Sequence, residues 1–181
     1  MPFIKKYGCL KPIKTNLPKL GTLLSLNKDN LHPHPNIKTC IIENALTPKL
    51  VIEYSNVTQS YSGVPKLVLA HKMYGFPYID QAGTYGISNR DNYIFKDYSI
   101  KEMEILKRFL STKTILYIYE STRYRMKYLE KYAFEFIPDI TKIKDFPETI
   151  NDETVATYFG FDAEDKKHIQ TFQNKCYHSF P

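Results

Sequence analysis

The sequence predicts a mixed α+β fold, with a twisted sheet of short strands in the first half and a small helical bundle in the second. Between residues 49 and 97, short runs rich in Val, Ile and Leu alternate with turn residues, which is typical of β-structure. From residue 98 to residue 175 the apolar residues recur at helical spacing instead. A length of 181 residues fits one domain, or one domain with a small appendage.

Residues 1–48 are expected to form an irregular arm that precedes a domain over 49–181. Prolines at 2, 12, 18, 33, 35 and 48 each remove a backbone hydrogen-bond donor and restrict the preceding residue. One short strand is expected inside this arm, over residues 39–43.

Four or five short strands are expected in the β-rich part of the domain, among residues 49–54, 66–70, 76–80, 84–88 and 91–96. The third and fourth flank a compact connection, residues 81–83, in which Gly83 can adopt a positive φ. Tight turns between short strands indicate an antiparallel or mixed sheet with the usual twist.

The helical part begins at a capping box, in which Ser99 and Glu102 satisfy free backbone N–H groups. One apolar face follows at helical spacing: Ile100, Met103, Leu106 and Leu110. A second helix is expected after Ser111, a helical or mixed stretch over 124–132, and two short helices over 152–159 and 162–172. Asn151 or Asp152 is expected to cap the first of these two, and Asp162 the second.

Composition narrows the class of protein. No apolar run has the length of a membrane span, and the N-terminus lacks a secretory signal, so an intracellular protein is expected. Three widely spaced cysteines, Cys9, Cys40 and Cys176, indicate reduced thiols. A net charge of +6 is compatible with nucleic acid, with an anionic membrane surface, or with neither.

Sequence patterns of catalysis are missing. The chain has no G-x-G-x-x-G, no Asn/Asp-Pro-Pro-aromatic tetrapeptide, no P-loop, no G-x-S-x-G and no H-E-x-x-H. Two pairs of possible zinc ligands have their members two residues apart: His32 with His34, and Cys176 with His178. Neither pair has a second pair of ligands at the spacing of a zinc finger. Asp80 and Asp91 could bind the metal ion of a nuclease, but the compact Asp…Glu-x-Lys pattern of such a site is absent. No cofactor, metal or catalytic residue is therefore predicted.

Two stretches carry a resemblance to a known family. Residues 63–72 read Gly-Val-Pro-Lys followed by an apolar strand, and residues 80–90 read Asp-x-x-Gly-x-Tyr-Gly-Ile-Ser-Asn-Arg. Together they resemble the C-terminal target-recognition domain of type II adenine-specific DNA methyltransferases and fused restriction–modification enzymes. Shorter likenesses follow in the same order at 109–113, 136–140 and 157–165, with Thr112 departing from the family pattern.

The resemblance covers residues 50 to 172, and it implies DNA recognition without methylation. In that family the segment follows a large catalytic domain, whereas here it follows only the proline-rich arm. The implied partners are double-stranded DNA and a separate methyltransferase or nuclease subunit.

The loop over 88–93 is the first candidate contact with DNA. It places Arg90 between Asn89 and Asn92, beside the end of a predicted strand. Arginine can donate two hydrogen bonds to guanine, and asparagine can pair in the same way with adenine. The alternative is a solvated turn with an Arg–Asp pair. If Arg90 reads bases, Arg90→Ala lowers discrimination between sequences more than it lowers non-specific binding.

Two further stretches carry candidate DNA-binding residues. His71, Lys72 and Tyr74 follow an apolar strand and are expected on an exposed loop, and Lys66 is added by its position in the family motif. The second stretch interleaves cations with tyrosines, and its phosphate-binding candidates are Arg123, Arg125 and Lys127. The alternatives are plain loop exposure and a solvated helix face. Cations from 66–93 and 123–131 are expected to line one cleft of duplex width.

Three hypotheses follow, from different classes of protein. The first is a stand-alone DNA-binding recognition module without catalysis of its own. The second is a subunit of a split DNA methyltransferase or a small restriction-type nuclease. The third is a structural or interaction protein of a large DNA virus that retains only the fold.

Overall fold

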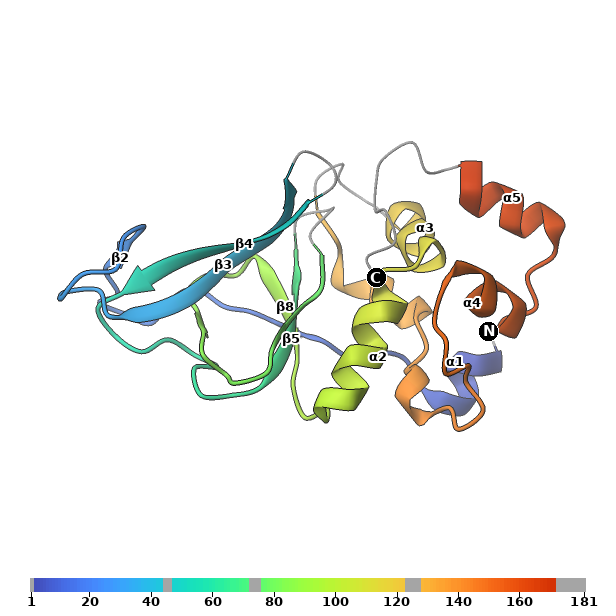
Figure 1. Cartoon of the computed structure of the whole chain (residues 1–181), viewed down its shortest axis with the longest axis horizontal. Coiled ribbons are helices and arrows are strands. Elements are labelled where there is room, and N and C mark those ends of the chain that lie inside the picture. The colour runs from blue at the N-terminus through green and yellow to red at the C-terminus, as the bar shows by residue number, and fades with distance from the viewer. Residues whose placement is uncertain (1, 44–46, 72–75, 123–127, 172–181) are drawn as a thin grey trace. The chain divides into compact units, whose positions relative to one another are not determined.

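The computed structural model describes residues 2–43, 47–71, 76–122 and 128–171 (Figure 1). The chain divides into two compact units, and each is described by itself. One unit is Pro12–Met103, and the other combines Met1–Lys11 with Glu104–Pro181. The first holds two four-stranded sheets and the second is helical, so the predicted mixed α+β fold is confirmed. Within the described residues, no helix has both the length and the apolar character needed to cross a membrane.

Unit Pro12–Met103 contains every strand of the described chain. In chain order these are β1 (Ile13–Lys14), β2 (Leu24–Ser25), β3 (His34–Glu43), β4 (Thr47–Ser55), β5 (Lys66–Ala70), β6 (Tyr78–Asp80), β7 (Gly86–Ile87) and β8 (Asn92–Phe95). One sheet has the order β1-β8-β5-β6 and the other β2-β4-β3-β7. The sequence predicted a single sheet. There are two because β6 pairs with β5 whereas β7 pairs in parallel with β3.

The longest element is the antiparallel hairpin of β3 and β4. Its register slips between Ile37 and Thr39, so Lys38 is an extra residue in β3 without a partner in β4. A bulge of this kind leaves the backbone groups of the extra residue outside the ladder. β2 pairs with the far end of β4, and it lies at one end of the hairpin in Figure 1.

β5 is the centre of the core of this unit. All five of its residues are buried, as expected of a strand covered on both faces. It pairs with β6 and β8 inside its own sheet and contacts β3 of the other sheet. The fully buried apolar side chains between these strands include Ile37, Cys40, Leu67, Val68, Tyr93, Ile94 and Phe95.

The helical unit consists of short elements. They are α1 (Pro2–Tyr7), α2 (Ile100–Leu110), which crosses the division between the units, α3 (Lys113–Ser121), α4 (Asp152–Tyr158) and α5 (Ala163–Thr171), with two 3₁₀ turns, η1 (Lys131–Phe136) and η2 (Ile140–Lys142). α3 contacts α4, α5 and η1. The buried side chains of this unit include Leu106, Phe109, Leu110, Ile115, Phe134, Ile137 and Val155.

The predicted helix caps are confirmed. The Ser99 N–H donates to the Glu102 carboxylate at 2.7 Å, and the Glu102 N–H donates to Ser99 Oγ at 3.3 Å. Asn151 caps α4 in a reciprocal box with Thr154. Asp162 Oδ1 accepts the backbone N–H groups of residues 164 and 165 at the start of α5. Caps depend on residues three apart, which is why the sequence alone reveals them.

The predicted irregular arm over 1–48 is wrong. It contains α1, β1, β2 and β3, and β3 begins at His34 rather than at residue 39. Pairing with β4 on one side and β7 on the other extends the strand through Pro35, because tertiary contacts outweigh local propensity in sheets. A division at residues 48 and 49 would cut into β4, one strand of the hairpin, and the divisions instead follow Lys11 and Met103.

Candidate nucleic-acid interface

The arginine turn, residues 88–92, joins β7 to β8, and the bulge in β3 fastens it. The Lys38 carbonyl, outside the strand ladder, accepts the Asn89 amide at 2.9 Å and the Asn92 amide at 3.2 Å. Asn89 Oδ1 in turn accepts the Asp91 N–H and the Asn92 Nδ2–H, both at 2.9 Å. Two asparagine side chains therefore tie the turn to β3 and to itself.

Backbone hydrogen bonds hold the end of the turn. The His71 N–H donates to the Asp91 carbonyl at 2.8 Å, which extends the pairing of β5 with β8. The Thr15 N–H and Oγ donate to the Asn92 carbonyl at 3.0 and 2.9 Å. Ser88, at the start of the turn, donates to the buried Glu53 carboxylate. The turn is fixed at both ends.

Arg90 is the side chain that this turn leaves in solvent. It is exposed, and it forms no ion pair with Asp91 or with another described residue. The predicted alternative of an Arg–Asp pair is therefore wrong in this structure. A guanidinium presents five donors in a planar fork that fits guanine O6 and N7 or two phosphate oxygens. A fixed backbone lowers the entropy that such a contact costs.

Asn89 and Asn92 do not have the predicted role of contacting bases. Asn92 is fully buried, and Asn89 donates its amide nitrogen to β3 and uses its oxygen inside the turn. An asparagine reads adenine only when both groups face the base. Both residues instead position Arg90.

Lys66 is not placed to contact phosphate, because its side chain is 0% exposed. Its ammonium donates to Asp80 Oδ2 at 2.6 Å and to three backbone carbonyls at 2.6 to 3.1 Å, those of Tyr61, Val64 and Tyr85. Burial lowers the pKa of Lys66, and the hydrogen bond and charge of Asp80 oppose that effect. Lys66 is therefore a buried structural residue of the sheet.

Asp80, a possible metal ligand in the sequence, belongs to the same hydrogen-bond network as Lys66. Its carboxylate accepts the backbone N–H groups of Thr84 and Tyr85 at 2.8 and 2.9 Å, besides the Lys66 ammonium. Gly83 lies inside this turn with a φ of 67°, and a Cβ there would lie 2.6 Å from the Val64 nitrogen. Asp80 is therefore structural.

The remaining candidates are divided between the described and the undescribed residues. His71 is half-buried, with its ring edge-on to Tyr93 at a centroid distance of 5.6 Å. Five candidates lie outside the described residues: Lys72, Tyr74, Arg123, Arg125 and Lys127. The predicted cleft depends on these five and on both units, and it stays a prediction.

Neither described cysteine forms a disulfide. The Cys40 thiol is also not suited to act as a nucleophile. Burial raises the pKa of the Cys40 thiol to about 12, so the thiolate is scarce at neutral pH. His32 bonds Asp29 at 2.9 Å rather than pairing with His34. In the ranges that the structure describes, no three His, Cys, Asp or Glu side chains are grouped as a metal site requires.

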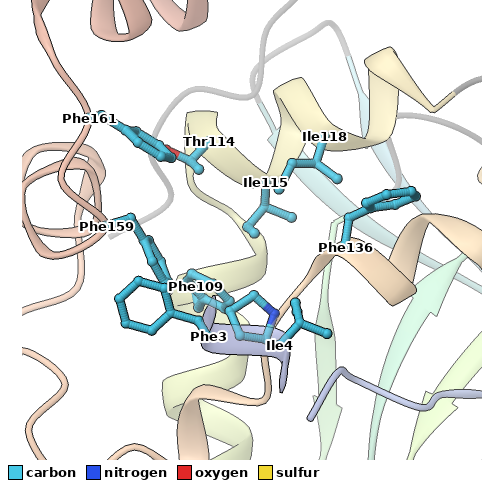
Figure 2. A pocket seen from close by; sticks show the side chains of 10 residues that line it. Phe3, Ile4, Phe109, Thr114, Ile115, Ile118, Phe136, Phe159 and Phe161 are labelled. Atoms are coloured by element: carbon cyan, nitrogen blue, oxygen red, sulfur yellow. The ribbon is translucent and has the colours of Figure 1, made fainter. Parts of the chain in front are cut away.

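An apolar pocket of about 280 Å³ lies in the helical unit (Figure 2). Phe3, Phe109 and Phe159 line one side of it, and Ile115 and Ile118 of α3 line another. Thr114 supplies the only side-chain hydroxyl among the ten lining residues. With no titratable group in its wall, the pocket fits an apolar group and offers no acid, base or nucleophile.

Sequence reasoning missed a second surface feature, the leucine loop, which we define as residues 17–31. Its six leucines are exposed, whereas leucines are usually buried. The available signal was the density of leucine in a stretch that also carries Pro18, Gly21 and Asn30, because such turn residues keep apolar side chains out of regular structure.

Comparison with known proteins gives no further guide to the site: no family model, curated protein or solved structure matches the chain. The likeness to target-recognition domains therefore stays a prediction from the residues quoted above.

Proposed function

We propose that the chain is a DNA-recognition module that binds duplex DNA and uses Arg90 to contact a base edge. The observation that supports it most is the geometry of the arginine turn. Three hydrogen-bond acceptors, Lys38 O, Asn89 Oδ1 and Asn92 O, hold the turn while the guanidinium stays in solvent. Reading a base requires a donor fork on a positioned backbone, and this turn supplies the positioned backbone.

Sequence recognition also needs phosphate contacts, which supply most of the affinity for DNA. The net charge of +6 favours an anionic partner. The cations proposed for phosphate are Lys72, Arg123, Arg125 and Lys127. In this proposal the module positions DNA for a separate methyltransferase or nuclease subunit, and the chain itself performs no chemical step.

Selection from a random duplex library tests the proposal without a known target site. The wild-type chain is expected to enrich a motif that contains a G·C pair. Arg90→Ala is expected to lose the preference at that pair while retaining the others, because one bidentate contact contributes about 1–3 kcal/mol of discrimination. Arg90→Lys is expected to recover little of it, since a lysine lacks the planar fork.

Arg108→Ala is the matched control, because Arg108 is also an exposed arginine but belongs to a regular helix, α2. It removes the same charge and is expected to leave the enriched motif unchanged. The proposal fails if the wild-type chain enriches no motif, or if Arg90→Ala and Arg108→Ala enrich the wild-type motif equally.

A further inference from the structure

The leucine loop carries most of the large apolar side chains that are exposed in the described part of the chain. Its leucines, at positions 17, 20, 23, 24, 26 and 31, are between 44% and 104% exposed. Among the described residues only three other large apolar side chains are exposed: Val57, Tyr132 and Phe136. Six such leucines amount to an apolar area on the order of several hundred Å², similar to one side of a small protein interface.

Two polar side chains from the stretch after β4 form hydrogen bonds with the loop. Buried Gln59 accepts the Lys19 N–H at 3.0 Å and donates to Thr22 Oγ at 2.8 Å. Asn56 accepts the Leu23 N–H at 2.7 Å and donates to the Gly21 carbonyl at 3.2 Å. Buried Gln59 and half-buried Asn56 thus fasten the backbone of the loop, while the leucines stay exposed to solvent.

Charge distinguishes among the surfaces that this loop could meet. Lys19 Nζ donates to the Thr58 carbonyl at 2.7 Å, and Asp29 is paired with His32 at 2.9 Å. Lys28 is therefore the one charged residue of the loop without a partner among the described residues. The loop also contains no aromatic residue. A surface that binds an anionic membrane combines clustered cations with aromatic side chains, and this loop has neither.

A nearly neutral apolar surface is complementary to a copy of itself. In a twofold dimer the same patch faces itself, so a charged patch repels its copy whereas an aliphatic one does not. β2 lies at the edge of its sheet, inside the loop, and an edge strand offers backbone groups for pairing with another chain. We propose that the leucine loop is the interface of a homodimer of this chain.

Sedimentation velocity of the full chain over a concentration series tests this proposal. At about 50–100 µM the wild-type chain is expected to sediment with the mass of two chains, since an interface of this size supports micromolar association. Leu20→Asp/Leu26→Asp is expected to sediment as a monomer, with association weakened at least about 30-fold, because each dimer would bury four carboxylates. Both leucines are exposed in the monomer, so its melting temperature should stay within about 2 °C of the wild type.

The matched control is Gln81→Asp/Ala82→Asp, which adds the same two charges to an exposed turn of the same unit. It is expected to remain dimeric. The proposal is overturned by a wild-type chain that is monomeric throughout the series, or by a dimer that both double variants weaken equally. A monomer that cosediments with vesicles of phosphatidylcholine and phosphatidylserine would also overturn it, in favour of a lipid surface.

Discussion

The arginine turn and the leucine loop belong to the same unit and are fastened in the same way, but they present opposite chemistry to solvent. In each, an asparagine side chain both donates to a carbonyl and accepts a backbone N–H: Asn89 in the turn and Asn56 in the loop. The turn leaves one cation exposed, and the loop leaves six leucines exposed.

The difference shows that side-chain amides can order a surface segment without deciding what it binds. An ordered segment loses little conformational entropy on binding, whichever partner it meets. In the two proposals above, the exposed side chains select that partner: the guanidinium selects DNA, and the leucines select another apolar surface. Variants that loosen one segment should therefore affect one kind of binding and spare the other.

The largest expected effect concerns the buried ion pair of Lys66 and Asp80, at the opposite end of β5 from the arginine turn. Lys66→Ala leaves the buried Asp80 carboxylate with two backbone donors and no counter-charge. We expect a loss of about 3–5 kcal/mol in the free energy of unfolding, measured by urea denaturation. Lys66→Met/Asp80→Leu should cost less, because it removes both charges together. A loss under 1 kcal/mol in Lys66→Ala would show that the ion pair does not hold this sheet.

Gly83, in the turn between β6 and β7, and Gly21, in the leucine loop, offer a matched comparison of two turns in the same unit. Both have a positive φ, of 67° and 76°, but a Cβ at Gly83 would meet backbone at 2.6 Å whereas nothing lies within 4 Å at Gly21. Gly83→Ala should cost about 2–4 kcal/mol and Gly21→Ala about 1–2 kcal/mol, measured by thermal unfolding. Equal costs would mean that the turn around Gly83 relaxes freely.

Asn89→Ala and Asn56→Ala should each cost about 1–2 kcal/mol of stability, because each removes hydrogen bonds of a half-buried amide. Their effects on binding should separate. Asn89→Ala lowers discrimination between duplexes and leaves the sedimentation coefficient unchanged, and Asn56→Ala does the reverse. If either variant alters both properties by the same factor, the two segments do not act independently.

The smallest expected effect is a pH dependence of the leucine loop. The hydrogen bond from His32 lowers the pKa of Asp29, whose carboxylate also accepts the Leu31 and His32 N–H groups. A lowered pKa means that this stabilisation is complete above the ordinary pKa of aspartate, about 4, and is lost as the pH falls through the lower folded value. The protection of the Leu31 and His32 amides from hydrogen exchange, relative to their intrinsic rates, should therefore fall below about pH 4. Asp29→Ala should abolish this pH dependence.

The elements that the sequence predicted depend on neighbouring residues. The boundaries of β5 and the caps at Ser99 and Asn151 follow from residues a few positions apart. The site depends on partners far apart in the chain. Asn89 meets the Lys38 carbonyl across 51 residues, and only pairing with β4 shows that this carbonyl lies outside the ladder.

The wrong prediction that Lys66 contacts phosphate also arises from partners far apart in the chain. A lysine at the start of an apolar strand is ordinarily solvated, and local pattern gives no sign that Asp80 and three carbonyls will surround it. The leucine loop was missed because Pro18, Gly21 and Asn30 interrupt its leucines, so no continuous element assigned them to an inner or an outer face.

The most direct test of the account is the salt dependence of DNA binding by the wild-type chain and Arg90→Ala, measured by fluorescence anisotropy on the selected duplex and on a scrambled duplex. With the four phosphate contacts proposed above, the wild-type slope of log K against log salt should be about −4. Arg90→Ala should reduce affinity for the selected duplex about 5- to 100-fold and change the slope by less than about 1. Equal losses on the selected and scrambled duplexes, or no binding by the wild-type chain at about 50 mM salt, would contradict the account.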